Sequence, residues 1–570
     1  MTRLVSSPAT AADVAALMRP PQEVMRLARI GAFHPTRLSF VRTLVRRMGR
    51  EAWHFEIARR DLDADGYGCV VYRIDTPAGR LSFVAFSSYL AAEERTDRVI
   101  AEKWDAAFAL VAGEADDAAV ARLRAALPLQ EAGRFSAAEL VLSRANRSVR
   151  LFDHVVDCLA AGRQPDLGQL VRVGYLMRTT AVYGNGKFGI ADLDRVRQQG
   201  VFALPYQAEM LTVYMARQLS FDLVDHIARQ RSPAAVALSA QSKRALGVGN
   251  ATGLGMAPFL VGHPKLLNAW IAARETALAR VRAARAVDAA HCSHFAVLLG
   301  RASRHAAQWR TDDTVQMARI ETLRAELDGL RRDLVDPAFL ATQRPWDILY
   351  LRAAQRLSVE TQEMLASLLI ELYPERVDEL ENATGADERE DLDPAMRLSD
   401  LQALIERAYG WALGQSYDSR AARHFFWYRS AEKDEPRLGE RFAEPGADKE
   451  LPIGIGALVA ELHEAVRARA AADPDETVGL FLLAHPRWRG ILRRVQALAD
   501  LPYAEIRDNL IGDFCRPVDL LRGKLAIFGA GKFDPKSDRW TRITLFQGAP
   551  LIEELGATDA DDWLFPGFPV

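Results

Sequence analysis

The stretch that decides the fold class is WHFEIARRDLDADGYGCVVYRIDTPAGRLSFVAFSSY, Trp53–Tyr89. It holds three short, partly alternating segments that are rich in aromatic and β-branched residues, and the turn-forming sequences DADG and TPAG separate them. This pattern predicts a three-stranded antiparallel meander. DLDADG also matches the start of an EF-hand loop, but Tyr72 stands where that loop needs a bidentate Glu, so we interpret it as a hairpin turn.

Most of the remaining sequence has a helical pattern. Apolar residues recur at helical spacing over Phe135–Gly162, and Ser136 with Glu139 forms a capping-box pair at its start. Residues 265–334 are rich in Ala, Arg and Leu, as in long packed helices. We therefore predict a mainly α fold: a multi-helix, bundle-like core with a small antiparallel β-sheet near the N-terminus and one or two strands near the C-terminus.

Two changes in composition suggest the domain organisation. Glu381–Met396 is acidic and poor in large apolar residues, which predicts an exposed loop. Ser430–Gly454 is charged and contains Pro and Gly, which predicts a long irregular segment. We expect an α+β region with the meander at 1–130, a helical core at 131–380, and a helical region with a long charged loop at 397–570.

Bulk composition narrows the class of protein. Across 570 residues, 73 Lys and Arg balance 75 Asp and Glu, so no global charge draws the chain to nucleic acid or to an anionic membrane. Four scattered cysteines without a CxxC pair argue against a disulfide framework. The N-terminus lacks the apolar core of a signal peptide, and no apolar run has the length of a membrane span. We expect a soluble cytoplasmic protein without nucleic-acid or membrane partners. The sequence leaves open whether the protein forms a homo-oligomer.

Two similar stretches, VYGNGKFG at Val182–Gly189 and IFGAGKFD at Ile527–Asp534, raise the question of a phosphate loop. Neither has the first Gly or the Ser/Thr that a P-loop requires, and the GxGxxG match of the first copy lacks a βαβ context. The alternative is two similar tight turns.

The first copy has the more polar neighbours. In RTTAVYGNGKFG we expect Arg178 and Asn185 to bind an anion and Tyr183 or Lys187 to move a proton. The other interpretation is a helix that ends at Gly184. We expect the second copy, with Lys532, to share the turn geometry but not the function.

A second candidate is GVGNATGLGMAPFLVGHP at Gly247–Pro264. We interpret this uncharged, glycine-rich run as a buried loop between helices, in which backbone approaches another element closely. Its amides and side chains would then bind an anion; the residues that we expect to do so are Gly249, Asn250, Thr252 and Gly253. Close packing of helices through small residues explains the run equally well.

The third candidate lies in RAARHFFWYRSAEKDEPRLGER, Arg420–Arg441. His424 has the right chemistry for an acid or a base near neutral pH, and Arg429 or Arg437 for a bidentate carboxylate clamp. An exposed salt-bridge network that orders an irregular loop is the alternative.

Together these residues favour a cytoplasmic enzyme that acts on a small carboxylate- or phosphate-bearing metabolite by acid–base chemistry, in the lyase, isomerase or hydrolase range. A non-catalytic helical protein that binds a metabolite or a partner is the first alternative. The second is a cofactor-dependent helical oxidoreductase with a flavin or haem, which only the lone GxGxxG motif supports. The sequence identifies neither a cofactor nor a set of metal ligands.

Overall fold

The structure is a computed structural model of the chain. It describes residues 10–95, 103–127, 136–181, 185–186, 189–191, 196, 198, 200–202, 204–253, 259–285, 287–333, 342–387, 389–417, 425–430, 434–438, 447–452, 455–507, 517–530, 532–535, 540–557 and 560–568. No helix in these ranges is long and apolar enough to cross a membrane.

The chain divides into two compact units, and neither is continuous in sequence. The helical unit comprises Met1–His34, Gly253–Val287 and Pro337–Lys524, and the sheet unit comprises Pro35–Thr252, Asp288–Asp336 and Leu525–Val570. These units do not correspond one to one to the three consecutive regions expected from composition, and that division stays a prediction.

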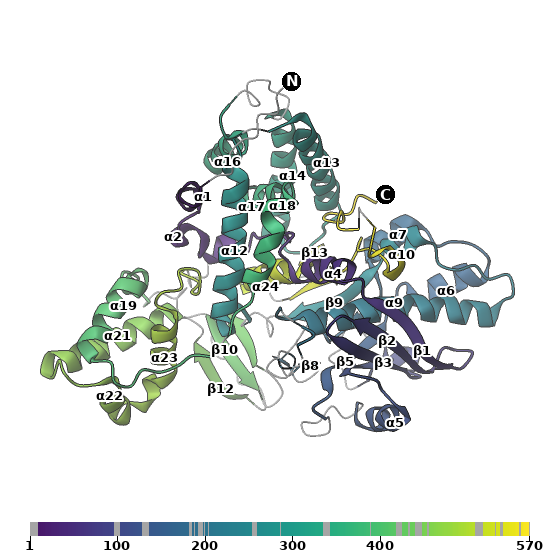
Figure 1. Cartoon of the computed structure of the whole chain (residues 1–570), viewed down its shortest axis with the longest axis horizontal. Helices are drawn as coiled ribbons and strands as arrows, with labels where there is room; N and C mark the ends of the chain where they lie inside the picture. Colours follow the sequence, from purple (N-terminus) through teal and green to yellow (C-terminus); the bar gives the residue numbers. More distant parts are fainter. Residues whose placement is uncertain are drawn as a thin grey trace. The chain divides into compact units, whose positions relative to one another are not determined.

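A large mixed sheet organises the sheet unit (Figure 1). Its neighbouring strands are, in order, β1 (His54–Leu62), β2 (Gly68–Thr76), β3 (Gly79–Ser87), β4 (Ala106–Ala112), β5 (Glu139–Arg147), β6 (Tyr175–Thr179), β9 (Gly247–Gly253), β14 (Trp540–Leu545) and β13 (Lys532–Pro535). Each pair from β1 to β6 is antiparallel, whereas β6 and β9 are parallel. The short strands β7 (Asn185–Gly186) and β8 (Gly189–Ala191) pair with each other, and β8 also pairs with β5.

The prediction of a mainly α fold with only a small N-terminal sheet is therefore wrong. The three expected strands are present as β1–β3, but they are the beginning of a sheet that curls into a half-barrel and takes in strands from the far end of the chain. The N-terminal meander was recognisable because each of its strands is joined to the next by a short turn. Pairings between distant segments leave no such local signal.

The helix predicted over Phe135–Gly162 illustrates the cause of the error. The Ser136 hydroxyl does donate to the Glu139 carboxylate at 3.1 Å, but Glu139 begins strand β5 instead of a helix. Helix α6 starts only at Phe152 and ends at Ala160. Every residue of β5 is buried, so both faces of the strand are packed, and its polar residues do not alternate with apolar ones as in a half-exposed strand. Tertiary packing thus overrides a local capping signal.

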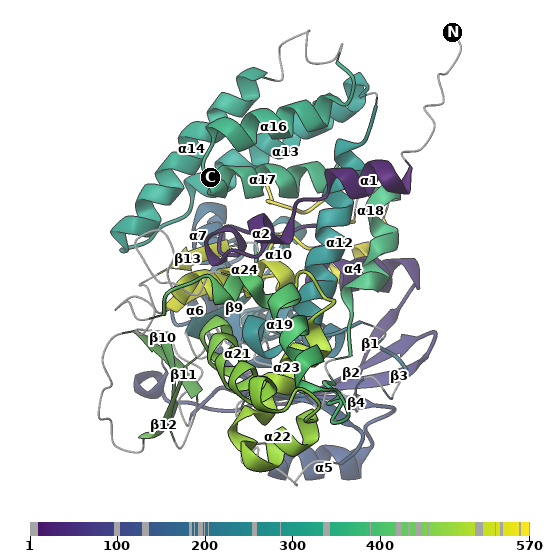
Figure 2. The same cartoon turned by 90° about the vertical axis from the view of Figure 1, so that its left-hand side faces the viewer.

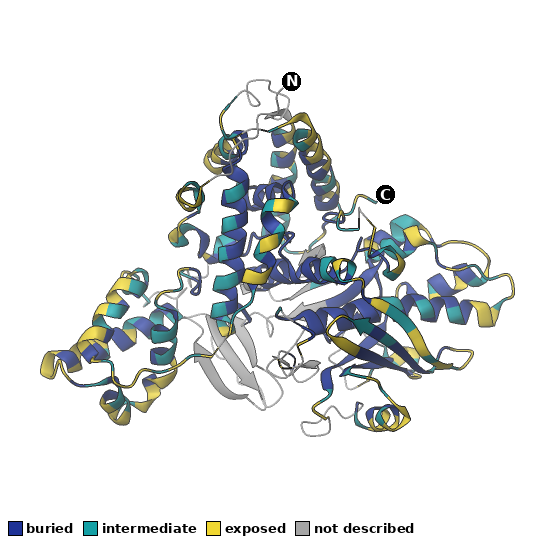
Figure 3. Cartoon of the chain, viewed as in Figure 1, coloured by how far each residue is buried: buried dark blue, intermediate teal, exposed yellow. Residues whose placement is uncertain are grey.

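Helices cover the two faces of the sheet differently. Helix α9 (Gln207–Arg231) lies on the face that carries Tyr72, whose hydroxyl donates to Asp222 of α9 at 2.6 Å; we call this the α9 face. Helix α5 (Asp117–Ala126) packs on the opposite face through Val120 and Leu123, and we call that the α5 face. Figure 3 shows the central strands buried and the outer surface of α5 exposed.

The glycine-rich run is a strand, which corrects the prediction of a loop between helices. Gly247–Gly253 forms β9, and the long helix α9 with the short helix α10 (Ala240–Arg244) connects it to its parallel neighbour β6. The sequence predicts the close approach at Gly253 or Gly255, whereas the structure shows it earlier in the run, at Gly247 and Gly249. A Cβ at Gly249 would lie 2.5 Å from Cδ1 of Tyr175, and one at Gly247 would collide with the Leu545 carbonyl oxygen. Gly255 lies outside the described residues.

Ion pairs of the C-terminal segment join the sequence-distant parts of the sheet unit. Asp561 accepts from Arg42 Nε at 3.1 Å, on helix α4 (Phe40–Arg50), and pairs with Arg37. Asp562 accepts from Arg301 Nη2 at 2.9 Å, on helix α13 (Ala289–Ala307). Adjacent carboxylates therefore connect the C-terminal segment to two helices that are far apart in the sequence.

Helix α12 (Pro264–Arg282) is central to the helical unit (Figures 1 and 2). The elements that pack against it are α1 (Ala11–Leu17), α16 (Pro345–Arg356), α17 (Val359–Ile370), α18 (Pro374–Val377) and the 3-10 helix η4 (Asp378–Thr384). The start of the acidic segment is therefore structured, because Glu381 and Thr384 of η4 are buried. Beyond it, most described residues up to Pro394 are partly or fully exposed, as expected.

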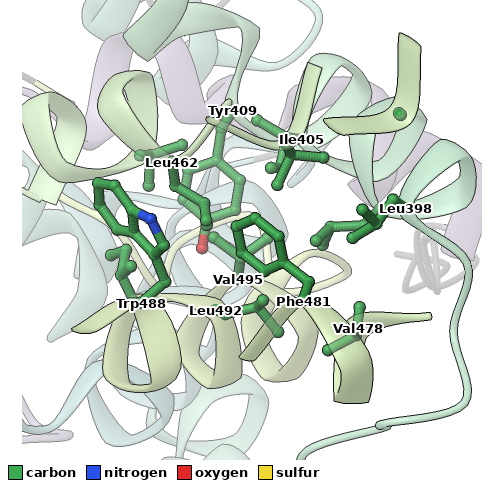
Figure 4. Packing of buried hydrophobic residues seen from close by; sticks show 14 of the residues in the cluster. Leu398, Ile405, Tyr409, Leu462, Val478, Phe481, Trp488, Leu492 and Val495 are labelled. Carbon is green, nitrogen blue, oxygen red and sulfur yellow. The ribbon is translucent and has the colours of Figure 1, made fainter. Parts of the chain in front are cut away.

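A second group of helices in the helical unit has a separate hydrophobic core. Its helices are α19 (Leu398–Leu413), α21 (Ile455–Ala472), α22 (Val478–Ala484) and α23 (Arg489–Leu498). Leu398, Tyr409, Leu462 and Phe481 meet between them, as Figure 4 shows. Strands β10 (Phe425–Ser430), β11 (Asp434–Leu438) and β12 (Ala447–Pro452) pair in an antiparallel sheet. Strands β11 and β12 lie within Ser430–Gly454, the segment predicted to be irregular.

We predict that Gly249→Ala destabilises the sheet unit by about 1–3 kcal/mol, the usual cost of overpacking a close contact. Chemical denaturation of the two proteins measures this difference. The matched control is Gly490→Ala in helix α23, where a Cβ would meet no described atom within 4 Å. The stability of Gly490→Ala should equal or slightly exceed that of wild type, because Ala has a higher helix propensity than Gly. In a Tyr175→Ala background Gly249→Ala should cost little, and an undiminished cost would contradict the proposed steric cause.

Candidate functional site

Three polar side chains gather on the α5 face of strands β5 and β6. The strand register places Asn146 directly opposite Arg178, so both side chains stand on the same face of the sheet. Arg144 precedes Asn146 by two residues on β5 and shares that face. We call Arg144, Asn146 and Arg178 the basic face. Hydrophobic residues of this face pack under α5, and Leu142 is the last of them on β5 before Arg144.

The basic face is buried. Arg144, Asn146 and Arg178 are exposed by 6%, 1% and 1%. The Arg144 guanidinium carbon lies 3.7 Å from the ring centroid of Trp104, and that of Arg178 lies 5.9 Å from the ring of Tyr175. Burial lowers the pKa of Arg144 to about 10, because a cation loses hydration energy when it leaves water. An anion bound nearby would restore part of that energy.

Hydrogen bonds to the backbone hold β5 and β6 in place at Arg144. Thr180 N–H donates to the Arg144 carbonyl oxygen at 2.9 Å, and Arg144 N–H donates to the Thr180 hydroxyl at 3.0 Å. The Thr179 hydroxyl donates to the same carbonyl at 3.0 Å. The hydroxyls of Thr179 and Thr180 thus position the Arg144 backbone.

Asn146 is bonded through one half of its side-chain amide. Its Oδ1 accepts from the N–H of Asp105 at 3.1 Å, at the start of β4. The Asp105 carboxylate is directed elsewhere: it accepts from Arg147 N–H at 2.9 Å and from Arg95 Nε at 3.1 Å. Among the described residues no hydrogen-bond acceptor meets Asn146 Nδ2, although this atom is buried. Buried donors without a partner are rare, and each needs an explanation.

Strand β9 borders the basic face. Gly249 is the register partner of Arg178, and the absence of its side chain leaves room for the ring of Tyr175. The next residue, Asn250, is buried and donates from Nδ2 to the Thr179 carbonyl oxygen at 2.5 Å. The structure thus brings Arg178, Gly249 and Asn250 together from two candidate stretches, with Asn250 bonded to the backbone of β6.

The remaining predicted site residues are only partly described or not described. Tyr183, Lys187 and His424 lie outside the described residues. For Asn185 in β7 and for Thr252 and Gly253 in β9, only the backbone is described.

Arg429 and Arg437 belong to strands of the helical unit. The register places Arg429 opposite Asp434 and Arg437 opposite Phe426. The clamp role predicted for these arginines stays a prediction.

Sequence reasoning does not place Arg144 and Asn146 in the site, because both lie within Phe135–Gly162, for which the sequence predicts a helix. On a helix, residues two apart point in different directions, whereas on a strand they share a face. The available signal was ELVLSRANR, in which buried-type residues lead directly into alternating Arg144, Ala145 and Asn146. An interpretation as a strand would have aligned both polar side chains.

The helical unit also contains buried charges, and a group of its arginines contacts two buried carboxylates. Arg19 donates to Glu275 from Nε at 2.7 Å and to Glu363 from Nη1 at 2.5 Å. Arg29 and Arg274 also donate to Glu363, each at 2.7 Å. Burial alone would raise the pKa of Glu363, but the three arginines outweigh it and hold this pKa well below its usual value. We call these five residues the Glu363 network and assign it to stability.

A second ion pair continues the same pattern on helix α17. Glu360 accepts from Arg522 and lies 3.0 Å from Nε2 of His34. Burial opposes ionisation of Glu360, yet the positive charge of Arg522 prevails and lowers its pKa to about 2. Burial lowers the pKa of His34. The charges of Glu360 and Arg522 thus offset each other within the protein.

We predict that Glu363→Gln destabilises the protein by about 3–5 kcal/mol at pH 7, because the buried Arg19 and Arg274 and the partly buried Arg29 lose their common carboxylate. The folded-state pKa of Glu363 lies below the unfolded value, so its contribution is complete above that value and is lost as pH falls. The difference between wild type and variant in urea unfolding should therefore be constant from pH 7 to about pH 5 and shrink as pH falls further, below the unfolded pKa. Glu379→Gln, in the exposed pair with Arg280, is the control and should cost less than about 1 kcal/mol. Equal costs for the two variants would contradict a structural role for the network.

Comparison with known proteins does not identify the chain: no protein-family model, no curated protein and no solved structure matches it.

Proposed function

We propose that the sheet unit binds a small oxyanion, a carboxylate- or phosphate-bearing ligand, on the basic face formed by Arg144, Asn146 and Arg178. The observation that carries this proposal is the combination of two buried guanidinium groups with a buried amide donor, Asn146 Nδ2, that has no partner among the described residues. Guanidinium and amide groups are the usual donors to carboxylate and phosphate oxygens.

The contrast with the Glu363 network supports this assignment. In that network the carboxylates on α12 and α17 meet the arginine donors. On the basic face, the neighbouring carboxylate of Asp105 is used by Arg95 and by the Arg147 backbone. A ligand oxygen at Asn146 Nδ2 would give this buried donor an acceptor.

Acid–base turnover of the bound ligand is the more specific form of the proposal. It assigns proton transfer to Tyr183 or Lys187, which precede and follow strand β7 in the sequence. Strand β8, which follows Lys187, pairs with β5 at Leu142 and Ser143, next to Arg144. This pairing of β8 beside Arg144 supports the assignment of the proton-transfer role to the first GxGK stretch.

Anion binding can be tested by thermal unfolding in inorganic phosphate and in citrate, with chloride at equal ionic strength as the reference. An anion at about a hundred times its Kd stabilises the folded protein by about 2.7 kcal/mol. Arg144→Gln should weaken binding by about 10- to 100-fold, since a charge-assisted hydrogen bond contributes about 1.5–3 kcal/mol. Arg59→Gln, on β1 with a partly exposed side chain, is the matched control and should bind as wild type. Binding that is unchanged in Arg144→Gln would contradict the proposal.

The role of Lys187 can be tested against Lys532, its counterpart in the second GxGK stretch. We expect Lys187→Ala to weaken anion binding by about tenfold or more without loss of thermal stability, because the ligand loses its contact with the ammonium group of this lysine. Lys532 begins strand β13, and Lys532→Ala should leave binding unchanged. Calorimetric titration with phosphate measures both, and equal effects would count against a special role for the first stretch.

A further inference from the structure

Asn146 has a structural role that accounts for only half of its side chain. Strand β4 begins at Ala106, so the N–H of Asp105 lies just outside the strand, and Asn146 Oδ1 accepts it at 3.1 Å. In this way Asn146 caps the N-terminal end of β4, because it accepts a hydrogen bond from the residue that precedes the strand. The other half of the amide, Nδ2, takes no part in this cap and is buried without a partner among the described residues.

The cap also determines which way the amide points. Rotating the amide by 180° would bring Nδ2 against the N–H of Asp105, and two donors would then face each other. Oδ1 therefore stays on Asp105, and Nδ2 stays on the other side. Because Asn146 is opposite Arg178 and two residues from Arg144, this donor belongs to the basic face. Its direction is set before any ligand binds.

We propose that Asn146 is the specificity-determining residue of the basic face, and that it selects a ligand whose oxygen accepts a hydrogen bond from Nδ2. This inference rests on the proposed anion binding and adds to it a discrimination that the arginines alone would not provide. Arginines attract any anion, whereas a buried and oriented donor requires an oxygen with a free lone pair at one position. A ligand that places an N–H group there would leave two donors facing each other, and such mismatches are strongly rejected.

Two variants separate this role from the cap. Asn146→Ala removes both halves of the amide and introduces no charge. It should lower the Tm of the unliganded protein through loss of the cap and raise the Kd for inorganic phosphate and for citrate by about tenfold or more. Asn146→Asp retains an oxygen for the Asp105 N–H and places a carboxylate beside Arg144 and Arg178. Its unliganded Tm should equal or exceed that of wild type, and the stabilisation by phosphate should disappear.

Calorimetric titration of the full chain with inorganic phosphate and citrate, alongside Tm measurements, decides between the roles. If Asn146 only caps β4, Asn146→Ala should have a lower Tm and an unchanged Kd for phosphate and citrate. That result would overturn the inference. If Asn146→Ala does not fold, Asn146→Asp decides: a retained phosphate-dependent Tm shift would overturn it, and loss of the shift at an unreduced Tm supports it.

Failure of this inference can be distinguished from failure of the proposed function. If Arg144→Gln loses binding while Asn146→Ala retains it, the basic face binds anions and Asn146 does not select them. If wild type binds neither phosphate nor citrate, both proposals fail together. Preference of wild type for phosphate or for citrate identifies which oxyanion the face accepts better.

Discussion

The parallel pairing of β6 with β9 is the constraint on which the sheet unit depends. It joins the N-terminal meander to strands from the end of the chain, and without it these would be separate sheets. Parallel neighbours need a long crossover, which here contains the long helix α9. That helix covers one face of the sheet. The opposite face, beyond the part covered by α5, carries Arg144, Asn146 and Arg178. The same pairing needs glycine in β9, because Tyr175 occupies the space where a side chain at position 249 would lie.

The Glu363 network and the basic face bury charge in different ways. In the helical unit, the carboxylates of Glu275, Glu360 and Glu363 face arginines, so desolvation is offset within the protein. Such networks stabilise a unique arrangement but leave little for a ligand to gain. On the basic face of the sheet unit, burial lowers the pKa of Arg144, and the oriented donor of Asn146 has no acceptor among the described residues. An anion that accepted a hydrogen bond from Asn146 on the basic face would therefore gain free energy that the Glu363 network does not offer.

Part of the candidate site was predictable from residue type. Arg178, Gly249 and Asn250 were selected because an Arg fork, a glycine that permits close approach and an amide are suited to anion binding, and the structure brings them together from stretches about seventy residues apart. Arg144 and Asn146 were missed as members of the site because Ser136 and Glu139 imitate a helix start. Their alignment follows from the periodicity of a strand, and the choice between strand and helix was made by neighbours that the local sequence does not contain.

The sequence by itself determined the local features: the turns and strands of the N-terminal meander, the helices of the Ala- and Arg-rich stretches and the close backbone approach in the glycine-rich run. Each follows from properties of adjacent residues, such as φ preferences, hydrophobic period and side-chain volume. Only the tertiary structure decided that β5 and β9 are strands, that they belong to one mixed sheet, and that Asn146 lies opposite Arg178. Those outcomes depend on hydrogen bonds and packing between segments far apart in the chain, whose free energy no local pattern records.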